Sequence, residues 1–231
     1  MNEQKRTARI AGLWYLGLAL TGMLGFLLVR PAIHVAGDPA ATLANLVENG
    51  ALARLGVALE LGIVLTQALA IVWFYKLFRP LNATAAHALA WFGLANAMLV
   101  LVSAAFLAAE VTVATDARLA PGGDVIGTTR LLFELSQTLW SVGTIFFGLW
   151  LIPMGYVAAH SGRMPKALGF TLIAGGVGYI LNAFVTNGLD DVPVWLNSVL
   201  TLPAAVGEFW MIGYLLIFGI RPPVDSATSG L

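Results

Sequence analysis

The chain has 231 residues, 59% of them hydrophobic, with 12 basic and 12 acidic side chains and no cysteine. Soluble domains carry charge on roughly a quarter of their residues, so this composition and a mean hydropathy of +0.85 exclude a soluble domain and indicate a membrane protein. Zero net charge excludes a basic nucleic-acid-binding surface, and the missing cysteine excludes disulfide scaffolds and thiolate-bound cofactors.

Six long apolar runs are bounded by charged residues, at residues 10–29, 53–78, 85–109, 132–157, 166–187 and 200–220. Each reaches the roughly 20 residues that a helix needs to cross a bilayer. The runs are unbroken, which excludes the alternating pattern of a transmembrane β-barrel. The sequence therefore predicts an all-α polytopic fold, a six-helix transmembrane bundle that forms one domain over residues 1–221. Residues 222–231 are predicted to be a flexible polar tail.

The first loop carries its own helix signal. Asp38-Pro39 is a typical N-cap followed by proline in the first turn, and Asn49-Gly50 is a typical stop. Leu43, Leu46 and Val47 fall on one face between these signals. A short helix at about 39–49, lying on the outer membrane surface, is therefore predicted.

Lysine and arginine residues predict the orientation, because cytoplasmic loops hold most of them. With the N-terminus inside, eight basic residues lie on the inner side and four on the outer side: Arg30, Arg54, Arg118 and Arg130. Both termini are therefore expected to be cytoplasmic. Aromatic residues near the inner boundary, among them Tyr15 and Trp150, are interpreted as an anchoring belt.

The glycine cluster Gly175-Gly176-Val177-Gly178 lies within the fifth run. No strand precedes it, so a nucleotide-binding loop is disfavoured. Small residues in membrane helices allow close backbone approach, and these glycines are therefore predicted to form a helix-packing face.

Three glutamates stand inside the apolar runs: Glu60, Glu134 and Glu208. A charged side chain at the centre of a membrane helix costs about 2.5–3.5 kcal/mol on insertion scales, so each position needs an explanation. At about 1.5 Å of rise per residue, Glu208 and Glu60 lie roughly 20 and 24 Å from the inner basic boundary. Glu134 is expected near the outer interface, and all three in the outer half of the membrane.

Amide side chains follow these glutamates at helical spacing. Gln67 comes seven residues after Glu60, and Gln137 three after Glu134, so each shares a helix face with its carboxyl group. Asn96 supplies another amide from the third run. Together these residues predict an outward-facing acidic pocket whose deepest groups are Glu60 and Glu208.

The alternative interpretation is that the carboxyl groups only fix helix packing. Arg130 precedes Glu134 by four residues and is placed to pair with it. Glu60 and Glu208 have no basic residue at that spacing, so they are expected to be neutral unless water reaches them. A carboxyl group held in this way suits a proton relay, a cation site or a general acid.

Metal and cofactor chemistry receives no support from the sequence. His34, His87 and His160 lie at the ends of runs without ligand spacing, and serine-nucleophile and phosphate-loop motifs are missing. We therefore expect neither a metal nor a cofactor.

Five segments carry a resemblance to a known family: RTARIAGLWYL (residues 6–16), GVALEL (56–61), GTIFFGL (143–149), MPKALGF (164–170) and LPAAVGEF (202–209). They resemble the bacterial membrane family catalogued as domain of unknown function 4386. The resemblance covers nearly the whole chain and implies a six-span protein of the bacterial cytoplasmic (inner) membrane, in which Glu60 and Glu208 match acidic positions of the family. It implies no activity, substrate or cofactor. The sequence departs from the pattern at WFGLAN (91–96), where a basic residue followed by an acid is expected, so the resemblance supports no charge pair from the third span.

Three classes of function remain open. The first is binding or passage of a small cationic or amphipathic molecule, or of protons, at the pocket. The second is an intramembrane enzyme that modifies a lipid or isoprenoid with a neutral glutamate as general acid, and the third is a structural or regulatory membrane partner without a ligand. The expected partners are the lipid bilayer and a small-molecule or lipid ligand, and no nucleic acid. The sequence does not determine the oligomeric state.

Overall fold

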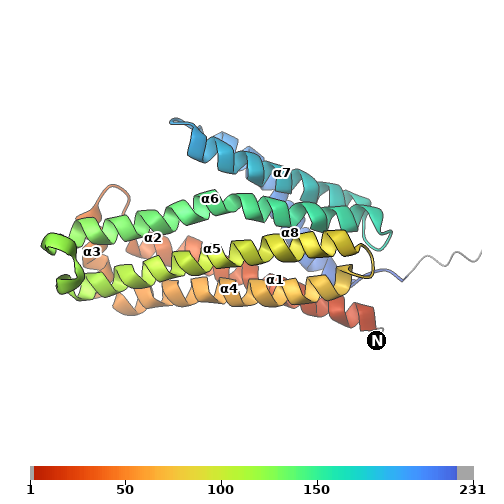
Figure 1. Ribbon diagram of the computed structural model, residues 1–231, viewed down its shortest axis with the longest axis horizontal. Coiled ribbons are helices and arrows are strands. Elements are labelled where there is room, and N and C mark those ends of the chain that lie inside the picture. Colours follow the sequence, from red (N-terminus) through yellow and green to blue (C-terminus); the bar gives the residue numbers. More distant parts are fainter. Residues whose placement is uncertain (1–2, 223–231) are drawn as a thin grey trace, which may run out of the picture. The chain divides into compact units, whose positions relative to one another are not determined.

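The computed structural model of the protein describes residues 3–222. The helices follow in chain order as α1 (Glu3–Met23), α2 (Arg30–Ile33), α3 (Pro39–Glu48), α4 (Gly50–Phe78), α5 (Ala83–Thr115), α6 (Val125–His160), α7 (Lys166–Gly188) and α8 (Val194–Ile217) (Figure 1). A π-helical segment, η1 (Leu24–Val29), joins α1 to α2, and two 3₁₀ turns, η2 (Ala117–Leu119) and η3 (Pro121–Gly123), lie between α5 and α6.

Six helical stretches are long and apolar enough to cross a membrane. They are Glu3–Ile33, Gly50–Phe78, Ala83–Thr115, Val125–His160, Lys166–Gly188 and Val194–Ile217. The described residues contain no β-strand. The prediction of an all-α polytopic membrane fold with six spans is confirmed. The predicted flexible tail lies outside the described residues beyond residue 222.

The helix ends differ from the predicted runs in informative ways. Each of the first five runs falls within its own helical stretch. The sixth run was predicted to reach residue 220, whereas its helix ends at Ile217. There the backbone N–H groups of Phe218 and Gly219 both donate to the carbonyl of Tyr214, and Gly219 has a φ of +70°. A glycine in this left-handed conformation is a common helix stop, so apolar residues continue past the helix end.

The helix signal of the first loop acts as the sequence predicts. Asp38 accepts a hydrogen bond from the backbone N–H of Ala41 at 2.9 Å and caps α3, the short helix after the first span. Asp124 accepts from the N–H of Gly127 at 2.8 Å and caps α6. Both caps satisfy N–H groups that the first helical turn leaves unpaired. The position of α3 on the outer membrane surface stays a prediction.

The chain forms two compact units. Unit 1 contains residues 1–15, 68–95 and 144–231, and unit 2 contains residues 16–67 and 96–143. Four helices contribute one segment to each unit: α1, α4, α5 and α6. Whether the six spans form a single domain stays a prediction, and the units are described separately below.

The core of unit 1 is aromatic. The rings of Tyr15 and Trp150 both pack on Phe74, with ring centroids 5.4 and 5.9 Å away. Tyr15 is 2% exposed and Trp150 1%. An added Cβ on Gly93 would collide with the Trp150 ring, so glycine makes the space for the indole. The interpretation of these two residues as membrane-surface anchors was wrong, because tertiary packing places them inside.

The glycines of α7 form the contact faces of unit 1. A Cβ on Gly175 would lie 2.9 Å from the Cβ of Ala204 on α8, and one on Gly178 would collide with the carbonyl oxygen of Leu200. Gly176 approaches the backbone of Gly148 on α6 in the same way. The predicted packing role of the cluster is confirmed, and it serves two neighbouring helices.

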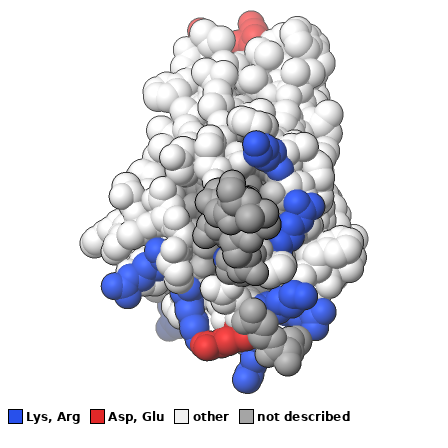
Figure 2. Space-filling view, turned by 90° about the vertical axis from the view of Figure 1, so that its right-hand side faces the viewer, with Lys and Arg blue, Asp and Glu red and all other residues white. Residues whose placement is uncertain are grey.

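Basic side chains gather at the end of unit 1 that carries the N-terminus (Figure 2). The basic residues of unit 1 are Lys5, Arg6, Arg9, Lys76, Arg79, Arg163, Lys166 and Arg221. Arg163 is buried there: its Nη2 donates to Oε1 of Gln4, and its Nε donates to the carbonyl of Arg221. This arginine therefore connects the start of the chain, the α6–α7 loop and the segment after α8.

Unit 2 is built on a close crossing of α1 and α4. A Cβ on Gly17 would lie 3.0 Å from Cγ2 of Thr66, and a Cβ on Gly62 would lie 3.0 Å from Cγ2 of Thr21. Each glycine thus faces a threonine of the other helix, which lets the two backbones approach. Beyond the crossing, α2 and α3 cover a buried apolar cluster that consists of Val29, Ile33, Leu46, Ala53 and Val111.

Candidate functional site

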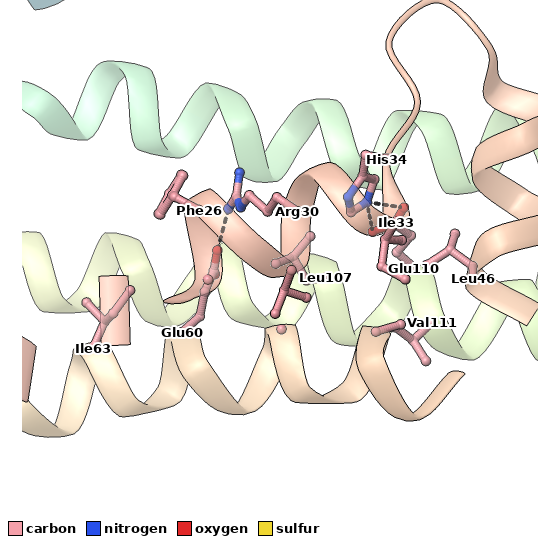
Figure 3. A pocket seen from close by; sticks show the side chains of 14 residues that line it. Phe26, Arg30, Ile33, His34, Leu46, Glu60, Ile63, Leu107, Glu110 and Val111 are labelled. Atoms are coloured by element: carbon pink, nitrogen blue, oxygen red, sulfur yellow. Dashed lines mark hydrogen bonds and ion pairs between the residues drawn. The ribbon is translucent and has the colours of Figure 1, made fainter. Parts of the chain in front are cut away.

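An ion pair between Arg30 and Glu60 lies at the centre of unit 2 (Figure 3). Glu60 projects from α4 and is 3% exposed. Its Oε1 accepts from Nη2 of Arg30 on α2 and, at 3.0 Å, from the indole Nε1 of Trp140 on α6. Arg30 also donates to Oε1 of Gln137. A charge buried in this way is stable only when it is paired and hydrogen-bonded, and three helices supply these partners.

The π-helical segment η1 determines where Arg30 points. Pro31 has no backbone N–H, and its ring crowds the carbonyl four residues earlier. The N–H of Arg30 donates to the carbonyl of Gly25, five residues back, instead of four. One extra residue in the turn rotates the following side chains by about 100° relative to a regular helix. Such bulges are frequent at functional sites, and this one brings Arg30 to Glu60.

A second polar pair lies one turn further along α2. Nε2 of His34 lies 3.1 Å from Oε1 of Glu110 on α5, and Glu110 is 1% exposed. The imidazole stacks on Phe133 of α6 with 3.7 Å between ring centroids. Nδ1 of His34 is buried without a hydrogen-bond partner. The His34–Glu110 pair therefore joins α5 to the end of the first span.

Two further pairs of polar side chains are hydrogen-bonded within unit 2. The side-chain amide of Asn96 donates to Oε1 of Gln67 at 3.0 Å, and the hydroxyls of Ser103 and Ser136 lie 2.8 Å apart. All four residues are buried. Gln67 and Asn96, which the sequence assigns to the pocket, thus contact each other between α4 and α5.

A small cavity is lined by residues of both the Arg30–Glu60 and the His34–Glu110 pairs. Its water-accessible volume is about 20 Å³, which is enough for roughly one water molecule. Arg30, His34, Glu60 and Glu110 line it together with apolar residues of α4 and α5 (Figure 3). Oε2 of Glu60 is buried without a hydrogen-bond partner. This space is called the small cavity below.

A larger space, called the open pocket below, adjoins the small cavity. Its volume is about 450 Å³, and its walls are the α2–α3 loop and the first turns of α6. Phe26, Arg30 and His34 line both spaces. The charged and polar residues of the open pocket are Arg30, His34, Asp38, Thr42, Thr129, Arg130, Glu134 and Gln137. Glu134 and Gln137, both predicted pocket residues, thus lie in one wall.

Glu208 belongs to unit 1 and has different partners. The hydroxyl of Tyr15 on α1 donates to its Oε1 at 2.7 Å, and the hydroxyl of Tyr179 on α7 donates to its Oε2 at 3.3 Å. Each carboxyl oxygen therefore accepts one phenolic hydrogen bond. The carboxyl group joins α1, α7 and α8 at the aromatic core.

The predicted site residues therefore fall into two groups. Glu60, Gln67, Asn96, Glu134 and Gln137 belong to unit 2, and Glu208 belongs to unit 1. A pocket shared by Glu60 and Glu208 stays a prediction. The sequence analysis missed two residues of the site: Arg30, counted only as a loop charge, and His34, taken as the end of a run. The dipeptide Arg30-Pro31 at the end of an apolar run is the signal that could have found the first of them.

The described residues show no assembled metal site. Within residues 3–222, no three His, Cys, Asp or Glu side chains are grouped to hold a metal ion. The site therefore offers a ligand charged groups, hydrogen-bonding groups and aromatic rings.

Comparison with known proteins places the chain in a family. Neither the curated proteins nor the solved structures contain a match. The family described as Domain of unknown function (DUF4386) matches residues 10–219, which is nearly the whole chain. The chain therefore belongs to the DUF4386 family.

Proposed function

We propose that the protein binds a small amphipathic cation in the open pocket of unit 2. The volume of about 450 Å³ falls within the range of small-molecule sites, roughly 300–1,000 Å³. Phenyl rings and charged groups both line the pocket, which suits a ligand with one apolar and one charged end.

The charge balance of the pocket favours a cationic ligand. Glu60 compensates Arg30, which leaves Arg130 opposed by two carboxylates, Asp38 and Glu134. Together, Arg130, Asp38 and Glu134 carry one net negative charge. Glu134 and Arg130 are both exposed, and among the described residues neither takes part in an ion pair. The free carboxylate of Glu134 is thus available to a ligand.

The aromatic lining gives the ligand its second contact. Phe26 and Phe133 line the same pocket as Glu134. A cation near an aromatic face gains about 0.5–1 kcal/mol at an exposed site, and the ring also contacts apolar atoms. The observation that carries the proposal is this combination of a free carboxylate and two phenyl rings in one pocket.

We further propose that the protein lies in the bacterial cytoplasmic membrane with both termini inside, so that the open pocket faces outward. The family and the distribution of basic residues support this: the eight of unit 1 would face the cytoplasm and the four of unit 2 the outside. The ligand would then approach from outside or from the outer membrane surface.

Equilibrium binding of tetraphenylphosphonium, an amphipathic cation, to the purified protein tests the proposal. Glu134→Gln should weaken binding about fivefold, because a charge pair at a partly exposed site contributes about 1 kcal/mol. Glu48→Gln removes an exposed acid of unit 2 that does not line the pocket and should leave the affinity unchanged. Equal affinity of both variants, or no binding by the native protein, would contradict the proposal.

A further inference from the structure

A groove lies on unit 1 between the start of α5 and the last third of α6. Its volume is about 480 Å³. All residues that line it belong to unit 1, and none of them lines the open pocket of unit 2. Ala85 and Ala88 contribute only methyl groups to the lining, so the space depends on small side chains. It is called the α5–α6 groove below.

The lining of the α5–α6 groove changes from polar to apolar along both helices. Asn82 and Thr84 lie at the N-terminal end of α5, and Tyr156 lies one turn before the end of α6. Phe92 on α5 and Leu149 on α6 lie roughly 12 and 10 Å further along their helices, at about 1.5 Å of rise per residue. The groove therefore has a polar end at the helix termini and an apolar end toward the middle of the two spans.

Arg79 lies near the polar end of the groove. It precedes Asn82 by three residues, in the turn that follows α4, where the backbone N–H of Asn82 donates to the carbonyl of Phe78. Arg79 is exposed, and its guanidinium lies 5.9 Å from the ring centroid of Tyr75. It takes part in none of the ion pairs of the described residues. Its charge is therefore available to an anion.

Lys166 supplies a second cation at this end of unit 1. The ring of His160 stacks on Tyr156 with 4.4 Å between centroids, and it lies 6.5 Å from the ring of Phe170 on α7. Lys166 precedes Phe170 by four residues, so the two share a face of α7. Lys166 is exposed and, within residues 3–222, belongs to no ion pair.

The acidic residues of unit 1 do not compensate these two cations. In the described part of the chain they are Glu3, Asp190, Asp191 and Glu208. Glu3 pairs with Lys76 at 3.2 Å, and Glu208 accepts hydrogen bonds from two tyrosines in the core. The two aspartates follow the end of α7, whereas Lys166 begins it. The polar end of the groove therefore presents a net positive charge.

We propose that the α5–α6 groove binds an anionic phospholipid. Its phosphate lies at the polar end, where Arg79 supplies the charge and the hydroxyls of Thr84 and Tyr156 donate hydrogen bonds. One acyl chain follows the groove toward Phe92 and Leu149. Both helices are long and apolar enough to cross a membrane, so the lipid enters sideways from the bilayer. Basic groups at the ends of membrane helices bind such head groups.

The first test compares phosphatidylglycerol, which is anionic, with phosphatidylcholine, which has no net charge. Native mass spectrometry of the purified protein in detergent measures the binding of each lipid. The native protein should bind phosphatidylglycerol more tightly. Arg79→Gln should weaken that binding about fivefold, the effect of one basic residue near a lipid surface. Arg6→Gln, which removes an exposed arginine of α1 in the same unit, is the control and should keep the native affinity.

The second test locates the lipid. Because the chain has no cysteine, Ala88→Cys introduces a single thiol into the groove. It should lose its reactivity toward a maleimide when phosphatidylglycerol is added, whereas Ala174→Cys, exposed on α7, should stay reactive. Ala88→Leu fills the groove and should lose phosphatidylglycerol binding, and Ala174→Leu should retain it. If Ala88→Leu does not fold, the protection of Ala88→Cys decides.

Several results would overturn the proposal. Equal affinity for the two lipids, or equal effects of Arg79→Gln and Arg6→Gln, rules out a site for an anionic head group. Full reactivity of Ala88→Cys with lipid bound rules out the groove. Equal protection by glycerol 3-phosphate, which has no acyl chains, shows that the groove holds no chain. Protection that needs no lipid and rises with protein concentration identifies a second copy of this chain as the occupant instead.

These results are independent of the cation site proposed in unit 2, because the groove and the open pocket share no residue. Loss of phosphatidylglycerol binding in Ala88→Leu should leave tetraphenylphosphonium binding unchanged. Failure of either proposal is thus distinguishable from failure of the other.

Discussion

Glu60 is held by partners that come from far along the chain. Arg30 lies 30 positions before it and Trp140 80 positions after it. Removing one member of a buried ion pair leaves the other charged and uncompensated, which costs more than the pair itself contributes. Replacing either Arg30 or Glu60 alone should therefore destabilise unit 2 more than replacing both together.

Arg30→Gln should lower the free energy of unfolding by about 3 kcal/mol, because the carboxylate of Glu60 loses its counter-charge. The double variant Arg30→Gln with Glu60→Gln should recover part of this loss. Thermal unfolding in detergent measures both. Arg54→Gln, an exposed arginine on α4, serves as the control and should unfold like the native protein. If Arg30→Gln were as stable as Arg54→Gln, the Arg30–Glu60 ion pair would contribute nothing to the stability of the protein.

At the scale of elements, the backbone contacts of glycine decide how the helices of unit 1 pack. α7 presents Gly175 and Gly178 to α8, and Gly176 to α6. Ala174, four residues before Gly178 and therefore on the same side of the helix, is exposed. Spacing alone therefore identified a helix that packs closely but not every residue on its contact face.

Gly178→Ala should destabilise the protein by about 1–3 kcal/mol, the usual cost of overpacking, since the new Cβ would collide with the carbonyl of Leu200. Gly213→Ala on α8 is the matched control, because a Cβ there meets nothing within 4 Å. The melting temperatures of the two variants provide the comparison. Equal values would show that α7 and α8 pack less closely than described.

At the scale of the whole molecule, basic residues are distributed unequally between the two units. The eight basic residues predicted to lie inside all belong to unit 1, and the four predicted to lie outside all belong to unit 2. Orientation in a membrane follows this bias. The topology is thus open to a direct chemical test.

The natural chain has no cysteine, so single cysteines report accessibility without background. A membrane-impermeant maleimide added to intact cells should label Ala117→Cys, in the α5–α6 connection, and not Thr84→Cys, at the start of α5. Thr84→Cys should become reactive only after the membrane is permeabilised. The reverse pattern would invert the proposed topology and place the open pocket in the cytoplasm.

Sequence reasoning succeeded where the signal is local. The six spans and the cap Asp38 could be predicted, because hydropathy is summed over contiguous residues and a cap acts within one turn. The same reasoning placed Tyr15 and Trp150 at the membrane surface, whereas both are buried. Position along a helix predicts depth, but it does not predict which side of the helix faces a neighbour.

By itself, the sequence determined the class of protein, the number of spans and the presence of carboxyl side chains within the apolar runs. Only the tertiary structure decided the partners of those groups: Arg30 for Glu60, His34 for Glu110, and two tyrosines for Glu208. The physical reason is rotational. A partner is selected by the angle of each side chain about its helix axis, and a single bulge such as η1 changes that angle by about 100°.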